Sequence, residues 1–243
     1  LAGFFAENFG RVLFIAHREE ILYQAKESFQ KIMPEKTFGI YNGNVKEGSA
    51  DAIFASIFTL SMITHLQQFQ DDEFDLVIVD EFHHAAADSY QRVLDYFKPK
   101  FLLGITATPE RNDNKDVYAI CDGNVAFRLD FLDAIQQNWL APFKYFGIFD
   151  DTDYSQIRWL GTHYDEEQLL QAQLREELSA KIIKSWEEKK QTRTIGFCSS
   201  IRQANYLSNF FNKRGYRTVS LHSQQIGLNR KTEIKKLADG DLD

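Results

Sequence analysis

Short runs of consecutive apolar residues alternate with amphipathic stretches through the first half of the sequence. The runs at 12–16 and 76–79 are apolar at every position, whereas a strand with one exposed face would alternate apolar and polar residues. Such runs are typical of parallel strands that helices cover on both faces, and the pattern therefore predicts a doubly wound α/β domain. The predicted strands are 12–16, 52–57, 76–79 and 101–105, and the predicted helices are 19–31, 59–69 and 88–97.

The alternation of strands and helices restarts after about residue 125. A stretch without clear periodicity, 150–163, interrupts it and predicts a loop. We expect an N-terminal domain over 1–140 and the first part of a second α/β domain over 141–243. The predicted strands of the second half are 143–149, 194–198 and 217–221, and the predicted helices are 166–190 and 202–213.

The composition is that of an ordinary folded chain: of 243 residues, 44% are hydrophobic and 26% are charged. No apolar run approaches the roughly 18 to 20 residues that cross a bilayer, so no membrane partner is expected. Two cysteines are too few for a disulfide scaffold, and they favour a reducing compartment, with the cytoplasm as the expected location.

The formal net charge of −7 argues against nucleic-acid binding through bulk positive charge. The region 175–236 nevertheless contains many more basic than acidic residues, which could supply a surface facing phosphates. Solvated helix faces are the competing interpretation, because exposed lysines are common on all proteins. Charge alone leaves both interpretations open.

Polar residues follow four of the predicted strands, at the point where each strand ends. In an open parallel sheet the carboxyl ends of the strands lie at one edge, where ligands bind. Any one of these clusters could simply cap the next helix, but four at one edge favour a site. The residues concerned are His17, Arg18, Ser56, Thr59, Asp80, Glu81, His83, His84, Thr106 and Thr108.

The adjacent carboxylates Asp80 and Glu81 carry most of the functional information. Two carboxylates at the end of a buried strand repel each other and lose hydration, so a cation or a proton-accepting role is expected to hold them there. Neighbouring strand residues point to opposite sides, so one carboxylate could hold a hard cation while the other acts on a water. His83 and His84 could link such a site to a neighbouring loop, or could simply cap the next helix. No His-Glu-x-x-His spacing or cysteine pair accompanies them, which disfavours a transition-metal site.

These motifs, taken in order, resemble those of superfamily 2 DEAD/DEAH-box helicases. Residues 80–83 form a D-E-x-H box, and Thr-Ala-Thr-Pro-Glu-Arg at 106–111 resembles motif III. Residues 17–22, 54–60 and 195–200 are similar to motifs Ia, Ib and IV. The details look closest to bacterial proteins related to restriction-enzyme motor subunits. The resemblance covers nearly the whole chain.

The resemblance implies a motor with two RecA-like lobes that uses ATP and Mg²⁺ on DNA or RNA. Asp80 would hold Mg²⁺, mostly through water, while Glu81 would orient and deprotonate the attacking water. His83 would sense the nucleotide state, and Thr106 and Thr108 would relay it. Helix capping is the alternative for both threonines, and a structural role is the alternative for the residues of the second lobe. The residues that the resemblance places along nucleic acid are His17, Arg18, Ser56, Thr59 and, in the second lobe, Ser199, His222 and Arg230.

The sequence also departs from the family pattern. The phosphate cradle G-x-x-x-x-G-K-[ST] and motifs V and VI are absent from it, and its first nine residues look like the helix that follows the cradle. We therefore expect flanking domains of the same polypeptide and an inactive chain on its own. Two other hypotheses remain: a non-catalytic nucleic-acid-binding or protein-interaction module on a RecA-like scaffold, and a metal-dependent hydrolase at the carboxylate-histidine cluster. Retention of both carboxylates and both threonines favours the motor.

Overall fold

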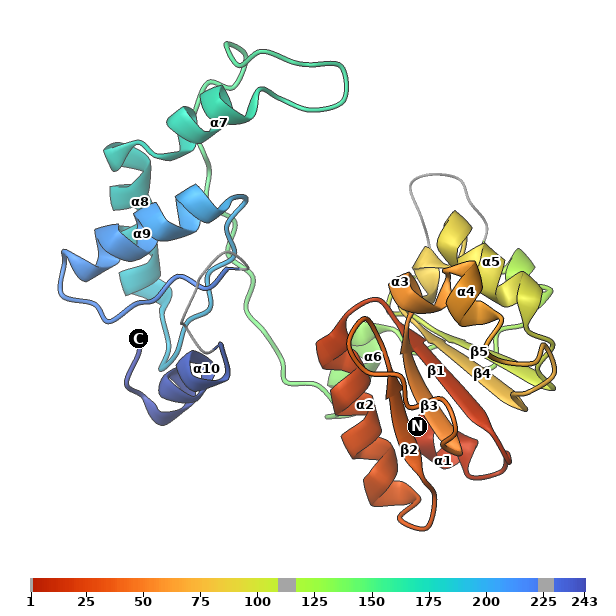
Figure 1. The fold of residues 1–243 in the computed structure, drawn as a ribbon. Coiled ribbons are helices and arrows are strands. Elements are labelled where there is room, and N and C mark those ends of the chain that lie inside the picture. Colours follow the sequence, from red (N-terminus) through yellow and green to blue (C-terminus); the bar gives the residue numbers. More distant parts are fainter. Residues whose placement is uncertain (1, 109–116, 223–229) are drawn as a thin grey trace. The chain divides into compact units, whose positions relative to one another are not determined.

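The chain forms two compact units, which a computed structural model describes over residues 2–108, 117–222 and 230–243. The units are Leu1–Ala141 and Pro142–Asp243 (Figure 1). None of the helices in the described ranges combines the length and the apolar character needed to cross a bilayer.

The first unit is built on a five-stranded sheet with strand order β2-β3-β1-β4-β5, in which every neighbouring pair is parallel. Ala16 pairs with Ser56 and Asp80 pairs with Ile105, so the predicted polar clusters follow strands that end at the same edge. The predicted α/β, RecA-like class is thereby confirmed. The strands are β1 Val12–Ala16, β2 Phe38–Tyr41, β3 Ala52–Ser56, β4 Leu76–Asp80 and β5 Phe101–Ile105.

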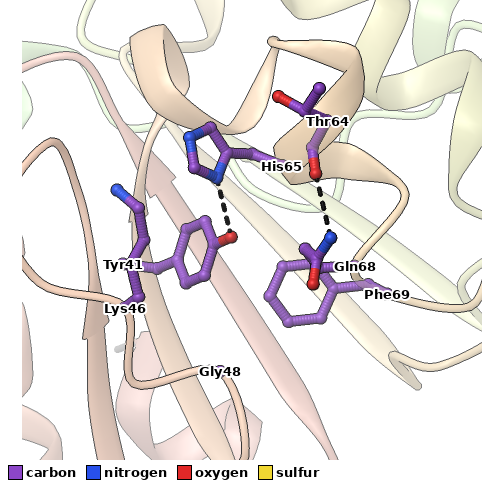
Figure 2. A pocket seen from close by; sticks show the side chains of 7 residues that line it. All are labelled: Tyr41, Lys46, Gly48, Thr64, His65, Gln68 and Phe69. Atoms are coloured by element: carbon purple, nitrogen blue, oxygen red, sulfur yellow. Dashed lines mark hydrogen bonds between the residues drawn. The ribbon is translucent and has the colours of Figure 1, made fainter.

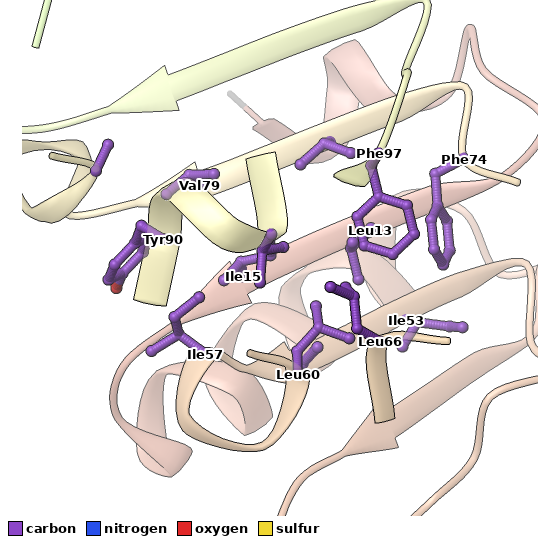
Figure 3. Close-up of a cluster of buried hydrophobic side chains, with 14 of the residues drawn as sticks. Leu13, Ile15, Ile53, Ile57, Leu60, Leu66, Phe74, Val79, Tyr90 and Phe97 are labelled. Carbon is purple, nitrogen blue, oxygen red and sulfur yellow. The ribbon is translucent and has the colours of Figure 1, made fainter. Parts of the chain in front are cut away.

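Helices cover both faces of this sheet (Figure 1). Because successive strand residues point to opposite faces, Leu13 and Ile15 pack in one buried cluster while Val12, Phe14 and Ala16 pack in the other. Figure 3 shows the first cluster, which lies under α3, α4 and α5. The helices of this unit are α1 Ala2–Ala6, α2 Glu19–Ile32, α3 Ile57–Leu60, α4 Ile63–Leu66, α5 Asp88–Tyr96 and α6 Phe131–Gln136, with short 3-10 turns at Phe82–His84 and Ala119–Cys121.

Two local features of the first unit differ from the sequence-based expectation. The helix predicted at 59–69 is two short helices, because the guanidinium of Arg92 donates to the carbonyl of Ser61 and Met62 is extended.

The edge strand β2 was not predicted. It contains Gly39, where an added Cβ would lie 2.1 Å from the carbonyl oxygen of Glu47. That close approach of the following loop explains a glycine in a strand, which weakens the sequence pattern.

Every regular element in the described residues of the second unit is a helix. The helix predicted at 166–190 is two helices, and the strands predicted at 143–149, 194–198 and 217–221 are wrong. A strand needs a hydrogen-bonded neighbour, and these segments pair with none in the described ranges; Phe197 is 95% exposed. Membership of this unit in a second RecA-like lobe stays a prediction. Its helices are α7 Glu166–Gln173, α8 Glu176–Lys189, α9 Ile201–Asn212 and α10 Arg230–Asp239.

Candidate functional site

The carboxylate pair lies where β4 ends. Asp80 is the last residue of β4, and its partner on β5, Ile105, directly precedes Thr106. The parallel register therefore brings the D-E-x-H box and the start of motif III side by side, although more than twenty residues separate them in the sequence. This is the arrangement that the strand ends predict.

Glu81 follows the strand in a left-handed backbone conformation, with φ 51° and ψ 49°. The expectation that both carboxylates alternate along one strand is therefore wrong, since only Asp80 is a strand residue. A left-handed residue other than glycine costs roughly 1–2 kcal/mol and persists only where surrounding contacts impose it. Here the chain turns at once into the 3-10 turn Phe82–His84, and the ring of Phe82 is buried against Gly104 of β5.

The imidazole of His83 joins the box to motif III. Its Nδ1 lies 3.0 Å from Oγ1 of Thr106, 3.5 Å from Oγ1 of Thr108 and 3.2 Å from Oε2 of Glu81. The backbone N–H of Thr108 donates to Oγ1 of Thr106 at 3.1 Å, which fixes the turn. One ring nitrogen therefore contacts both the acidic residue and the two threonines. Pro109, Glu110 and Arg111 of the motif lie outside the described residues.

The electrostatics of Asp80 favour a cation. Burial raises the pKa of this half-buried carboxyl, and the charge of Glu81 adds to the effect. The backbone N–H of Glu81 and the imidazoles of His17 and His83 act in the opposite direction. Burial and a like charge both destabilise the ionised form of this carboxyl group, so a nearby positive ion would stabilise it strongly.

His17 belongs to the same cluster. Its ring packs edge-on against His84 at 5.4 Å between centroids, and its charge acts on Asp80. Arg18, the next residue, is the N-cap of α2 and is exposed. The end of β1 thus supplies one residue facing the carboxylates and one facing solvent.

Ser56 and Thr59 lie at the end of β3 and in α3, and both are buried, with 5% and 6% of their surfaces exposed. At this exposure neither side chain offers much surface to a ligand. Their contact with a nucleic-acid backbone stays a prediction. Packing at the β3-to-α3 turn is the role that the described contacts give them.

Ser199, His222 and Arg230 belong to the second unit, whereas the carboxylate cluster belongs to the first. The hydroxyl of Ser199 donates toward the amide oxygens of Gln173, at 3.0 Å, and Gln203, at 3.1 Å. These bonds tie it to α7 and α9. Arg230 is exposed at the start of α10, and residue 223, next to His222, lies outside the described residues. Their role along nucleic acid stays a prediction.

The donor set at the strand ends fits Mg²⁺ better than a transition metal. In the described part of the chain, no group of three or more His, Cys, Asp and Glu side chains is arranged to hold a metal ion. Mg²⁺ usually keeps several waters and is held by one or two carboxylates together with substrate phosphates. Asp80 and Glu81 can supply the carboxylates. The transition-metal hydrolase hypothesis gains no support from this geometry.

A separate open pocket of about 390 Å³ lies between α4 and the loop that follows β2 (Figure 2). Tyr41 and His65 line it and are joined by a 3.0 Å hydrogen bond between the hydroxyl and Nδ1. None of the residues that line it belongs to the motifs at the ends of β1, β3, β4 and β5. The pocket is therefore separate from the carboxylate cluster.

Sequence reasoning missed two residues that shape the site, Phe82 and Gly104. An added Cβ at Gly104 would lie 2.4–2.7 Å from three ring carbons of Phe82. The sequence pattern that points to these two residues is an aromatic residue inside the D-E-x-H box together with a glycine in the next apolar run. Their contact follows only once the register of β4 and β5 is known.

Comparisons with known proteins agree with the motifs. Residues 2–111 match the family described as type III restriction enzyme, res subunit. A Schizosaccharomyces pombe protein named as a mitochondrial ATP-dependent helicase, irc3, is 30% identical over 94% of this chain and 39% of its own length. The Escherichia coli type I restriction enzyme EcoAI endonuclease subunit is 24% identical over 98% of this chain and 31% of its length.

A third relative is the DNA 3'-5' translocase XPB2 of Sulfurisphaera tokodaii, which is 34% identical over 30% of this chain and 17% of its own length. The chain thus spans well under half the length of each of these relatives. Motifs, sheet and relatives together make the chain a superfamily 2 helicase-like sequence, residues 2–111 of which are similar to the res subunit of type III restriction enzymes.

Proposed function

We propose that the chain is part of the core of an ATP-dependent helicase or translocase, in which hydrolysis of Mg-ATP at the carboxylate cluster is coupled to movement on DNA. The observation that carries the proposal is the set of contacts made by His83, whose Nδ1 lies within 3.5 Å of Glu81, Thr106 and Thr108. A group that touches both the proposed general base, Glu81, and motif III can transmit a change at one to the other. DNA is favoured over RNA because a relative is named as a DNA translocase.

The residues present have distinct tasks in this proposal. Asp80 would hold Mg²⁺ mainly through water, because its half-buried carboxylate gains from a cation. When bound, the ion neutralises charge on the phosphates. Glu81, held off the strand by its left-handed backbone, would orient a water and accept its proton. His83 would register these changes through its contacts with the threonines.

The 243 residues contain no G-x-x-x-x-G-K-[ST] sequence. Catalysis of phosphoryl transfer consists mostly of positioning and charge stabilisation, to which such a cradle contributes backbone amides and a lysine. We therefore expect the chain on its own to bind ATP weakly and not to turn it over. ATP turnover is to be measured on the whole protein.

Replacement of Glu81 by Gln tests the proposal. The amide keeps the size of the side chain but cannot accept the proton, so turnover should fall by about 10² to 10⁴ while nucleotide binding stays nearly intact. Phosphate release with and without DNA, together with the affinity for a fluorescent ATP analogue, measures both. Glu27→Gln, on the exposed side of α2, is the matched control and should behave as the parent.

Two outcomes would contradict the assignment. Parental turnover in Glu81→Gln would remove the proposed base. A parent that hydrolyses no ATP with any nucleic acid would favour a non-catalytic module on a RecA-like scaffold. An RNA-stimulated activity without DNA stimulation would keep the motor and change its partner.

A further inference from the structure

Tyr90 is a buried polar residue that the proposed mechanism does not use. It lies in the first turn of α5, it is 4% exposed, and its hydroxyl makes no hydrogen bond within the described part of the chain. Buried hydroxyl groups are nearly always bonded, because the loss of water is otherwise uncompensated. A buried and unbonded hydroxyl therefore calls for a partner that is not a side chain of the cluster around it.

The hydroxyl is turned toward the carboxyl ends of the strands. Figure 3 shows Tyr90 at one end of the buried cluster, near Ile57 and Val79, with its oxygen pointing away from Leu13 and Phe97. Val79 is the residue before Asp80, so this is the end of the cluster at which the carboxylate site begins. The ring of Tyr90 is stacked with that of His84, with 6.5 Å between the ring centroids. This contact fixes the orientation of the tyrosine ring on the side of the carboxylate site.

The charges around the hydroxyl make it a donor. Burial, followed by the negative charges of Asp80 and Glu81, raises the pKa of Tyr90 to about 12. The phenol therefore stays protonated at neutral pH, and its hydroxyl lies within the electrostatic influence of both carboxylates. A carboxylate next to a protonated hydroxyl is a natural acceptor, directly or through one water.

We propose that Tyr90 is a positioning residue of the carboxylate site: its hydroxyl donates a hydrogen bond through an ordered water toward Asp80 and holds that carboxylate in the orientation that binds the divalent cation. The water is required because no direct bond from the hydroxyl is formed in the described structure. The inference rests on the proposed function only for the role of Asp80. Groups that orient the ligands of a metal commonly change its affinity about 10- to 100-fold when they are removed.

Tyr90→Phe is the test, and Tyr96→Phe is its matched control on the same helix. The first removes only the unbonded hydroxyl, whereas the second removes a hydroxyl that donates to the carbonyl of Phe69 at 2.7 Å. The probe is Mn²⁺ alone, titrated into the whole protein without nucleotide and followed by electron paramagnetic resonance. Thermal unfolding of each variant is measured in parallel.

Each of the two variants should change a different measurement. Tyr90→Phe should bind Mn²⁺ about tenfold more weakly without a fall in its unfolding midpoint, and Tyr96→Phe should lose thermal stability and keep the parental Mn²⁺ affinity. Unchanged Mn²⁺ affinity in Tyr90→Phe would overturn the proposal. An equal loss of stability in both variants would also overturn it, because Tyr90 would then act through packing.

Asp80→Asn separates this inference from the proposed function. If Asp80→Asn abolishes Mn²⁺ binding while Tyr90→Phe has no effect, only the role of Tyr90 is wrong. If Asp80→Asn keeps the parental affinity, the cation does not bind at Asp80, and both the proposed function and the role of Tyr90 are wrong.

Discussion

The geometry of the D-E-x-H turn depends on the absence of one methyl group. Gly104 leaves space on β5 for the buried ring of Phe82, which stands between the catalytic candidates Glu81 and His83. Because the ring fills that space, the turn is held against the neighbouring strand at the level where Thr106 begins. The position of His83 relative to the threonines is therefore set partly by a contact between two residues with no chemistry of their own.

Gly104→Ala should damage both stability and activity. The added Cβ would lie under 3 Å from ring carbons of Phe82, and overpacking of this kind typically costs about 1–3 kcal/mol. We expect a loss of that size in chemical denaturation and reduced ATP turnover in the whole protein. Gly43→Ala is the control, since an added Cβ there meets no atom within 4 Å. Equal stability of the two variants would show that Phe82 moves freely.

At the residue scale, the sequence predicts which side chains gather but not how the backbone holds them. Asp80, His83 and Thr106 meet because parallel strands end at one edge, which the apolar runs already indicate. The left-handed Glu81 and the unbonded hydroxyl of Tyr90 depend on the packing of β5 and α5. Neither has a local sequence pattern, because both are results of tertiary contacts.

At the scale of the elements, one aspartate ties the starts of neighbouring strands together. Asp75, directly before β4, accepts the N–H of Gly10 at 3.0 Å and that of Arg11 at 3.2 Å through Oδ2. Its Oδ1 pairs with Nζ of Lys100, directly before β5, at 2.7 Å. The amino ends of β1, β4 and β5 are thus joined at the edge opposite the candidate site.

Asp75→Asn should weaken the first unit in a pH-dependent way. The bond from Lys100, followed by the backbone N–H groups of Arg11 and Gly10, lowers the pKa of Asp75. Because the pKa is lower in the folded protein than in the unfolded chain, the ionised carboxylate stabilises the fold. This stabilisation is complete above the pKa of the unfolded chain, about 3.9, and is lost as the pH falls through the pKa of the folded protein. We expect a loss of about 1–2 kcal/mol at pH 7, moderated by solvent screening.

Urea unfolding of parent and variant at pH 7 and at pH 3 measures this difference. The gap between them should shrink at pH 3, because below about 3.9 the carboxyl group of the unfolded parent binds a proton and the unfolded state is thereby favoured. Asp95→Asn, at an exposed position on α5, controls for the loss of one negative charge. A gap of the same size at both pH values would assign the effect to something other than the ionised carboxylate.

The elements of the first unit were largely predictable, and those of the second were not. Strands such as β1 and β4 follow their apolar runs, because both faces of a central parallel strand are buried. In the second unit an apolar run is not sufficient: 194–198 has the composition of a strand, but no neighbour pairs with it in the described residues. Sequence periodicity reports what a segment can form, whereas pairing depends on the rest of the fold.

At the scale of the whole molecule, burial is unevenly distributed between the two units. The strands β1 and β3 are buried at every position. In the described part of the second unit, the buried apolar residues are Ile157, Leu170, Ile183 and Phe210. Since tertiary packing supplies most of the stability of a helix, the two units should open with different free energies.

Hydrogen exchange on the intact chain measures this difference. The helices α2 and α8 both have 14 residues and so form a matched pair. We expect amides of α2 and of the central strands to exchange on the order of 100-fold or more slowly than those of α8. Equal protection of α2 and α8 would show that the second unit has a core as stable as the first.

The left-handed backbone at Glu81 also bears on how natural selection has acted on this sequence. Glycine occupies that conformation at no steric cost and asparagine at little, whereas glutamate is penalised there. In a lineage whose cluster had no task, stability alone would reward replacement of the glutamate. The proposed role of Glu81 as general base gives a reason for a glutamate to persist at a position that disfavours it.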